Sequence, residues 1–247
     1  MQQQAAAQAA QLGQMIAESK RIVFFGGAGT STESGIPDFR SSDGVFQATK
    51  EFGYPPEVLI SHDFFLRHTD VFYQYYRKFL LYPQAKPNAA HLALARLERQ
   101  GKLTAVVTQN IDNLHQAAGS KNVLELHGSV HRNYCMKCHR FYSLEDLLSM
   151  DNVPRCACGG LIKPDVVLYG EGLDDSVLSS AIAHISRADL MIIGGTSLVV
   201  YPAAGLADYF CGKNLAVVNL SPTNQDSRAQ LTICAPIGEV LSAAVPA

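Results

Sequence analysis

Four cysteines in two close pairs carry the clearest chemical signal. Cys135 and Cys138 form a C-x-x-C pair, and Cys156 and Cys158 form a C-x-C pair. Four thiolates at such spacing suit tetrahedral Zn²⁺ in a site of the zinc-ribbon type, whereas four unrelated thiols or disulfides are the alternative. Sulfur would fill every coordination position, so the metal is predicted to be structural. Basic residues nearby are expected to offset the charge of the site: Lys137, Arg140, Arg155 and Lys163.

His127 is a candidate general base, because imidazole titrates close to neutral pH and a glycine follows it at the end of an apolar run. A structural role is the alternative for a lone histidine. Asn110 and Asp112 lie two residues apart after another apolar run. They could hold a polar ligand or cap the next helix.

Glycines follow the first apolar run of the chain. Gly27 and Gly29 match the first two glycines of the dinucleotide fingerprint, but Thr32 stands where the third is expected. The hydroxyls of residues 30–32 are predicted to cap a short helix whose N-terminus favours phosphate. A turn without a ligand is the alternative. Residues 35–40, which include Arg40, could fold back over a bound molecule.

Five apolar runs with intervening helical segments predict a parallel, doubly wound sheet. Each run ends in small or polar residues, and ligands of such sheets bind beyond the carboxyl ends of the strands. These ends are therefore expected to converge on one rim: Gly27, Asn110, Asp112, His127, Ser197 and Asn219.

Other segments give coarser predictions. One helix is expected from near the start of the chain to about Ser19. A second is expected over 89–100 and ends before Gly101, with its inward face formed by Leu92, Leu94, Ala95 and Leu97. The aromatic-rich segment 41–81 is predicted to be a small helical module. Lys163–Glu171 is predicted to be either a core strand or an exposed edge to which a peptide could add.

Composition excludes several classes. The chain has 247 residues, 47% hydrophobic and 17% charged, with a net charge of −2. The sequence has no basic stripe of the kind that would indicate direct binding to nucleic acid, and it has no apolar stretch long enough for a membrane span. The start has no basic segment typical of a secretory signal. Clustered cysteines favour a reducing compartment, so a soluble cytoplasmic protein is expected, with Cys211 and Cys234 buried.

Taken together, the motifs from about Arg21 to Glu239 resemble the sirtuins, NAD-dependent protein lysine deacylases, of the bacterial or archaeal type. The motifs are Gly27-Ala-Gly29 with Ser31, Ser34–Arg40, Thr108–Asp112, Leu114-His115, His127-Gly128, the four cysteines, Tyr169–Glu171, Gly195–Ser197 and Val218–Leu220. Their order and the position of the cysteines between His127 and Tyr169 make the resemblance specific.

The resemblance implies residue roles. His127 would be the general base, with Asn110 the second catalytic residue. NAD, the co-substrate, would contact Gly27, Ala28, Gly29, Thr32, Asp38, Phe39, Arg40, Gln109, Asn110, Ile111, Asp112, His127, Gly195, Thr196, Ser197, Asn219, Leu220, Ser221 and Ile237. The substrate peptide would contact Val166, Val167, Tyr169, Gly170, Glu171, Val199 and Val200.

The implied reaction transfers the acetyl group of acetyl-lysine to ADP-ribose and releases nicotinamide. The implied fold is a Rossmann-like NAD domain (1–40, 82–128 and 166–247) with a small domain made of a helical module (41–81) and a zinc ribbon (129–165). Thr30 replaces the usual Ile or Val, and Tyr169 the commoner Phe. Tyr76 and Arg77 are adjacent rather than in the Tyr-x-x-Arg pair that reads acidic acyl groups, so simple acyl groups are expected.

Two alternatives are protein mono-ADP-ribosyl transfer and a non-catalytic NAD-sensing zinc-ribbon module, which would not need His127, Asn110 and Asp112 together. A dehydrogenase fits poorly, because the third fingerprint glycine and a ribose-binding acid about 20 residues further on are both missing.

Overall fold

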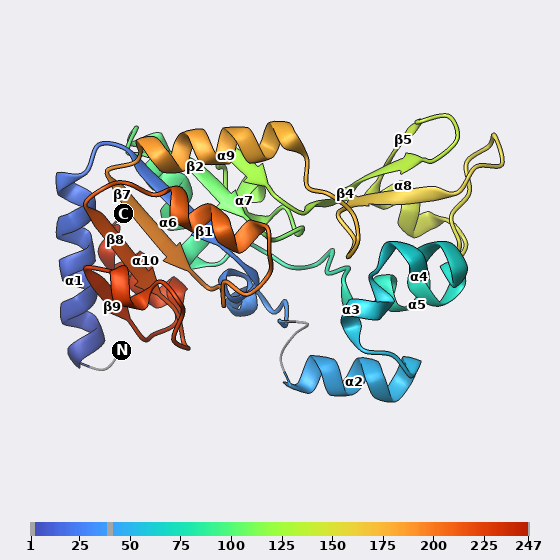
Figure 1. Ribbon diagram of the computed structural model, residues 1–247, viewed down its shortest axis with the longest axis horizontal. Coiled ribbons are helices and arrows are strands. Elements are labelled where there is room, and N and C mark those ends of the chain that lie inside the picture. Colours follow the sequence, from blue (N-terminus) through green and yellow to red (C-terminus); the bar gives the residue numbers. More distant parts are fainter. Residues whose placement is uncertain (1–2, 39–41, 247) are drawn as a thin grey trace.

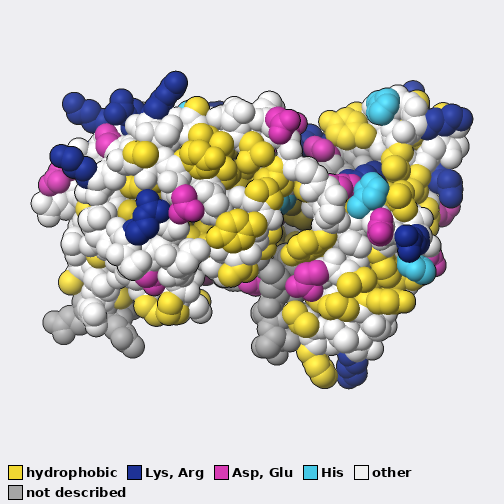
Figure 2. Space-filling view, in the orientation of Figure 1, with side chains coloured by type: hydrophobic (Ala, Val, Ile, Leu, Met, Phe, Trp, Pro, Cys, Tyr) yellow, Lys and Arg dark blue, Asp and Glu magenta, His cyan; other side chains and the backbone are white. Residues whose placement is uncertain are grey.

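The computed structural model describes residues 3–38 and 42–246. It has a larger and a smaller lobe (Figure 1), and the molecular surface is hollowed between them (Figure 2). The larger lobe is built on six parallel strands in the order β3-β2-β1-β7-β8-β9. Their bounds are β1 Ile22–Gly26, β2 Leu103–Thr108, β3 Val123–Glu125, β7 Leu190–Gly194, β8 Asn214–Val218 and β9 Leu231–Ile233. The parallel sheet is confirmed, but β9 was not predicted.

The strand order reverses between β1 and β7. The chain moves outward from β1 through β2 to β3, and it returns to pair β7 with the other side of β1. At such a switch point the loops leave in opposite directions and open a crevice at the carboxyl ends of the strands. The switch point lies at the paired ends Gly26 and Gly194, where the glycine-rich segments follow.

Alternating side chains of the central strands fill two cores. Ile22 and Phe24 pack on one face beneath α1 (Gln3–Glu18), α6 (Ala89–Arg99) and α10 (Ile237–Ala244). Val23 and Phe25 pack on the other face with α9 (Asp175–Arg187) and the 3₁₀ helix η3 (Ala203–Tyr209). Both faces are covered, which is why these strands are continuously apolar.

The predicted helices at the N-terminus and over 89–100 are confirmed as α1 and α6, and Gly101 follows α6 with a φ of +72°. One detail was wrong: Leu92 is 48% exposed, while the other expected inward residues of this helix are buried. Leu92 follows the core-facing His91 by one position, which rotates it toward solvent.

The smaller lobe joins two chain segments around one core. Four helices come from the first: α2 Ser42–Phe52, α3 Pro56–Leu59, α4 His62–Arg67 and α5 Thr69–Phe79. The second gives an antiparallel sheet β5-β4-β6 and one helix: β4 Gly128–Cys135, β5 Phe141–Ser143, α8 Leu144–Ser149 and β6 Ile162–Val166. Phe65, Phe72 and Tyr73 share a core with Leu147 and Ile162, so neither segment packs independently of the other.

Two further elements complete the description. The short helix α7 (Leu114–Ala117) follows the loop after β2, and the 3₁₀ helix η4 (Asp226–Arg228) precedes β9. Within the described residues, no helix has the length and apolar character needed to cross a membrane.

Two buried histidines lie behind the loop that follows β2. The His91 and His115 rings are 4.7 Å apart between centroids, and both side chains are at most 1% exposed. Neither ring nitrogen of His115 has a hydrogen-bond partner among the described residues. Burial lowers the pKa of His91 to about 4, an effect partly opposed by Asp112, and burial also lowers the pKa of His115, with His91 adding to the effect.

Stability is therefore expected to fall on mild acidification. The folded-state pKa of His91 lies below the unfolded value, so between these values the unfolded chain binds more protons. The free energy of unfolding should decrease from pH 7 to pH 5 by roughly 2 kcal/mol from His91 alone, and His115 acts in the same direction. Urea denaturation at the two pH values measures this loss.

The matched variants are His115→Leu and, as a control, His68→Gln at an exposed histidine. The first should reduce the pH-dependent loss, and the second should leave it unchanged. Equal losses in the wild type and in His115→Leu would contradict the contribution assigned to His115.

Candidate functional site

The metal-ligand residues meet as predicted. All four cysteine Sγ atoms lie within 4.8 Å of one another, and the cysteines are not joined by disulfides. Sγ–Sγ distances of 3.5 Å (Cys135–Cys158), 3.6 Å (Cys138–Cys156) and 3.4 Å (Cys138–Cys158) approach the roughly 3.8 Å edge of a tetrahedron with Zn–S bonds of roughly 2.3 Å. The four thiols therefore fit a structural Zn²⁺.

Two predictions about residues outside the four-cysteine cluster were wrong. Lys163 does not lie at the cysteines: its Nζ donates to Glu171 and to the Val166 carbonyl. Cys211 and Cys234 are exposed rather than buried, because they lie in loops outside both cores.

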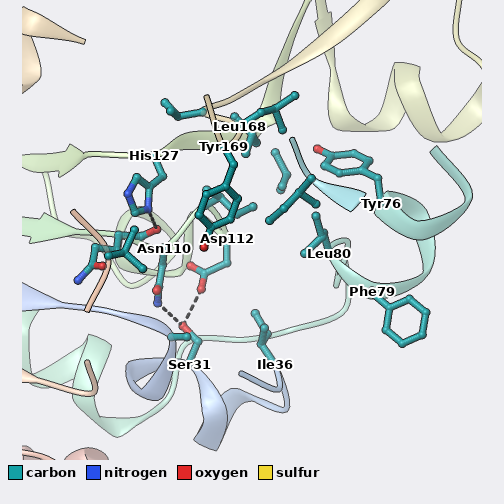
Figure 3. Close-up of a pocket in the computed structure, with 18 of the residues that line it drawn as sticks. Ser31, Ile36, Tyr76, Phe79, Leu80, Asn110, Asp112, His127, Leu168 and Tyr169 are labelled. Atoms are coloured by element: carbon teal, nitrogen blue, oxygen red, sulfur yellow. Dashed lines mark hydrogen bonds between the residues drawn. The ribbon is translucent and has the colours of Figure 1, made fainter. Parts of the chain in front are cut away.

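A cavity of about 230 Å³ opens between the lobes (Figure 3). Many of the residues predicted for NAD or peptide line it: Ala28, Gln109, Asn110, Ile111, Asp112, His127, Val166, Val167, Tyr169, Gly170, Glu171 and Val200. Apolar residues of the smaller lobe, including Ile60, Phe79 and Leu80, form the opposite wall. The polar groups thus gather at one end of a largely apolar cavity.

His127 is oriented by the backbone of the neighbouring loop. Its Nδ1 lies 3.0 Å from the Gln109 carbonyl oxygen, which can only accept, so Nδ1 carries the hydrogen. In the neutral ring, Nε2 is then the nitrogen that can accept a proton. Gly128 makes this position possible: its φ is +74°, and a Cβ there would lie 1.9 Å from the Asp165 carbonyl oxygen.

Ser31 connects the two polar residues of the same loop. Its hydroxyl donates to Asp112 Oδ2 at 2.6 Å and accepts from Asn110 Nδ2 at 3.0 Å, as the dashed lines in Figure 3 show. Asp112 Oδ1 also accepts from the Leu114 N–H at 2.9 Å. The turn is thereby fixed. Asp112 lines the cavity and also bonds the first N–H of α7, and ligand binding by this residue stays a prediction.

Ser31 was not among the predicted site residues, although it belongs to one of the motifs that carry the family resemblance. The hydroxyls after the glycine loop were predicted to cap a helix, but the segment forms two 3₁₀ turns, η1 (Ala28–Thr30) and η2 (Thr32–Ser34). Ser31 instead bonds across to the loop after β2. The buried Thr30 hydroxyl donates to the Gly194 carbonyl oxygen at 3.4 Å, which explains how a polar residue is tolerated there.

The glycine loop and the loop after β7 touch at the switch point. Gly29 N–H donates to the Gly195 carbonyl at 2.8 Å, and a Cβ on Gly29 would lie 2.8 Å from the Gly195 Cα. Gln109 Nε2 donates to Thr196 Oγ1 at 3.0 Å. The predicted rim is therefore continuous from the cavity to the loop after β7.

The remaining predicted NAD and peptide residues are not in the lining of the cavity: Gly27, Gly29, Thr32, Asp38, Gly195, Thr196, Ser197, Val199, Asn219, Leu220, Ser221 and Ile237. Leu220 is 66% exposed at the rim. Ile237 is buried at the start of α10, packed against Gly194. Phe39 and Arg40 fall outside the described residues.

Segment 163–171 is divided between two environments. Residues up to Val166 form β6 and pair with β4 of the small sheet, and Val166 and Leu168 pack into the core of the smaller lobe. Residues 167–171 line the cavity, with the Tyr169 side chain 37% exposed. The core-strand interpretation therefore holds for the residues up to Val166, and addition of a peptide to the rest of the segment stays a prediction.

Arg77 is not available to a ligand in the cavity. Its Nη2 donates to the carbonyls of Leu147, Met150 and Asp151 at 2.9–3.3 Å and thus joins the two segments of the smaller lobe. The adjacent Tyr76 lines the cavity as a fully buried ring. No cation from this pair faces the apolar wall.

The chain is similar to known proteins over most of its length. A model of the Sir2 family matches residues 27–202. A protein of Clostridium perfringens named NAD-dependent protein deacetylase is 60% identical, with 93% of this chain and 95% of that protein covered. One from Clostridium acetobutylicum with the same name is 56% identical, with coverages of 95% and 97%.

Solved structures agree with these relatives. A Sir2 structure with deacetylated p53 peptide and 3′-O-acetyl ADP ribose is 42% identical and has a TM-score of 0.85, with 94% of this chain and 95% of that chain covered. A Sir2–p53 peptide–NAD⁺ structure is 43% identical, with a TM-score of 0.82 and 94% of each chain covered.

Proposed function

Because the chain belongs to the Sir2 family, we propose that the cavity between its lobes is the site of its NAD-dependent protein deacetylation. The protein is an NAD-dependent protein deacetylase that acts on acyl-lysine peptides, with NAD as co-substrate. The observation that carries the choice of site is the convergence of His127, Asn110 and Asp112 at one end of the cavity, beside the switch point of the sheet.

The side chains fit distinct tasks. His127, held through Nδ1, would remove the proton of the attacking ribose hydroxyl at Nε2. Asn110 and Asp112, fixed by Ser31, would hold the polar nicotinamide and ribose groups, while Ile36 and Ile111 provide apolar surface. Nicotinamide would leave as a product. The glycines at the switch point would lie against the phosphates and adenosine, with the remaining predicted rim residues.

The zinc site supports this function without taking part in it. Four sulfur ligands leave no open position, so a bound Zn²⁺ would hold the ribbon together. We further propose the division into an NAD-binding domain and a small domain of two modules given above. Cytoplasmic location and the lack of a direct nucleic-acid partner also remain proposals; thiolate metal ligands favour a reducing compartment.

A series of acyl-lysine peptides tests the proposed substrate class. With Arg77 bound to backbone carbonyls and an apolar wall opposite His127, kcat/KM should be at least about 100-fold higher for acetyl-lysine than for succinyl-lysine. Peptide mass spectrometry over time measures the two rates with one peptide sequence. Equal rates for the two acyl groups would contradict the proposal.

Protein mono-ADP-ribosyl transfer is the remaining alternative in this family. Radiolabelled NAD distinguishes it, because the label would stay on protein rather than appear in a small molecule.

A further inference from the structure

The Glu171 carboxylate lies in the cavity wall and is bonded by groups from three parts of the chain. Oε1 accepts from His62 Nδ1 at 2.8 Å, and Oε2 accepts from Lys163 Nζ at 3.1 Å and from the Leu168 N–H at 2.9 Å. The Glu171 side chain is only 21% exposed and that of Lys163 19%. Charge-assisted bonds of this kind are strong and directional. The three side chains His62, Lys163 and Glu171 are called the Glu171 cluster below.

His62 brings the smaller lobe's helices into the cluster. Its backbone N–H donates to the Tyr169 carbonyl at 3.0 Å, and the Tyr169 N–H donates to the Ile60 carbonyl at 3.1 Å. Ser61 and Tyr169 thus form a parallel bridge. The helical segment and the cavity wall are joined both by backbone pairing and by the His62–Glu171 contact.

Lys163 holds the other side of the same turn. Besides Glu171, its Nζ donates to the Val166 carbonyl at 3.0 Å and to the Pro164 carbonyl at 3.3 Å, and so spans the end of β6. The turn is closed by a bond from the Glu171 N–H to the Leu168 carbonyl at 2.9 Å. Gly170 within it has a φ of +92°. Residues 166–171 are therefore fixed from both ends, although those after Val166 are not part of a regular strand.

We propose that the Glu171 cluster positions residues 166–171 for the substrate peptide, with His62 as a positioning residue contributed by the helical segment. This rests on the proposed function, in which these residues receive the peptide. Both carboxylate oxygens are already bonded, so Glu171 orders the backbone of the segment and does not select basic side chains of the substrate.

The primary test uses Glu171→Gln, which keeps the shape of the side chain but loses its charge. The peptide KM, and the peptide Kd measured by fluorescence anisotropy, should rise about tenfold, while kcat and the KM for NAD stay within about twofold. Peptides with basic or neutral flanking residues should be affected by the same factor. The matched control is Glu51→Gln, which breaks the exposed Glu51–Lys78 ion pair of the smaller lobe and should change none of these values.

Conservative pairs separate positioning from general destabilisation. His62→Asn keeps a donor near the place of Nδ1 and should retain most peptide affinity, whereas His62→Leu should lose about as much as Glu171→Gln. Lys163→Arg should likewise retain more peptide affinity than Lys163→Met. These pairs keep the test decisive if Glu171→Gln does not fold.

Unchanged peptide affinity in Glu171→Gln and His62→Leu would overturn the proposal, as would equal losses in peptide KM, NAD KM and kcat. A selective loss for basic peptides would also overturn it, because Glu171 would then read side chains. Failure of the proposed function and failure of the cluster proposal can be told apart. A wild-type protein that binds acetyl-peptide without NAD-dependent deacetylation would refute the proposed function, and the peptide Kd values of the variants would still test the Glu171 cluster.

Discussion

Replacing His127 with alanine should lower the deacetylation rate by about 10³-fold, the size expected for loss of a general base. The ring lines the cavity just after β3, and because Nδ1 bonds the Gln109 carbonyl we propose that Nε2 accepts the ribose proton. NAD binding should change little, because Asn110, Asp112 and Ser31 hold one another without His127. Rates come from peptide mass spectrometry, and NAD affinity from calorimetry.

An exposed histidine provides the control for this variant. His68→Gln should keep the full rate, and both variants should bind zinc and unfold at the wild-type temperature. If His127→Ala kept more than about a tenth of the rate, the general-base assignment would be wrong. A parallel loss of NAD affinity would instead indicate a binding role.

Removing one zinc ligand should abolish activity from a distance. Cys135 is fully buried, and Cys135→Ser should lose the metal and about 4 kcal/mol or more of stability, since binding energy of structural zinc is folding energy. The ribbon shares its core with α4 and α5, so the apolar wall of the cavity should be lost with it. Zinc content, thermal unfolding and deacetylation rate are the measurements.

The two cysteines outside the cluster are matched controls. Cys211→Ser and Cys234→Ser should keep one zinc per chain and full activity, because both side chains are exposed in loops. A Cys135→Ser protein that still held zinc and deacetylated at the wild-type rate would show that the four thiols are not a structural site.

The rim of the site could be predicted because each central strand is a short apolar run that ends in a polar or glycine residue. Parallel pairing then places these ends together, as Gly29, Gly195 and Gln109 demonstrate. Strand β9 was missed because it has three residues with an exposed threonine in the middle, a pattern too short to recognise.

Contacts that depend on packing between distant segments could not be predicted. Ser31 is a hydroxyl residue after a glycine loop, which locally indicates a cap, yet its partners come from the loop after β2. His62 meets Glu171 across 109 positions of sequence. Lys163 was assigned to the cysteines by proximity in sequence, but β6 runs away from them and carries its ammonium toward the cavity. Local pattern gave the elements, and tertiary pairing decided their partners.

The most direct test of the central claim is the product balance of one reaction. The account requires the acetyl group, NAD and His127 to meet in one cavity, so each deacetylated peptide should be accompanied by one nicotinamide and one O-acetyl-ADP-ribose, with no reaction when NAD is omitted. Quantitative mass spectrometry of all three products measures this ratio. Deacetylation that released free acetate at an equal rate without NAD would contradict the account.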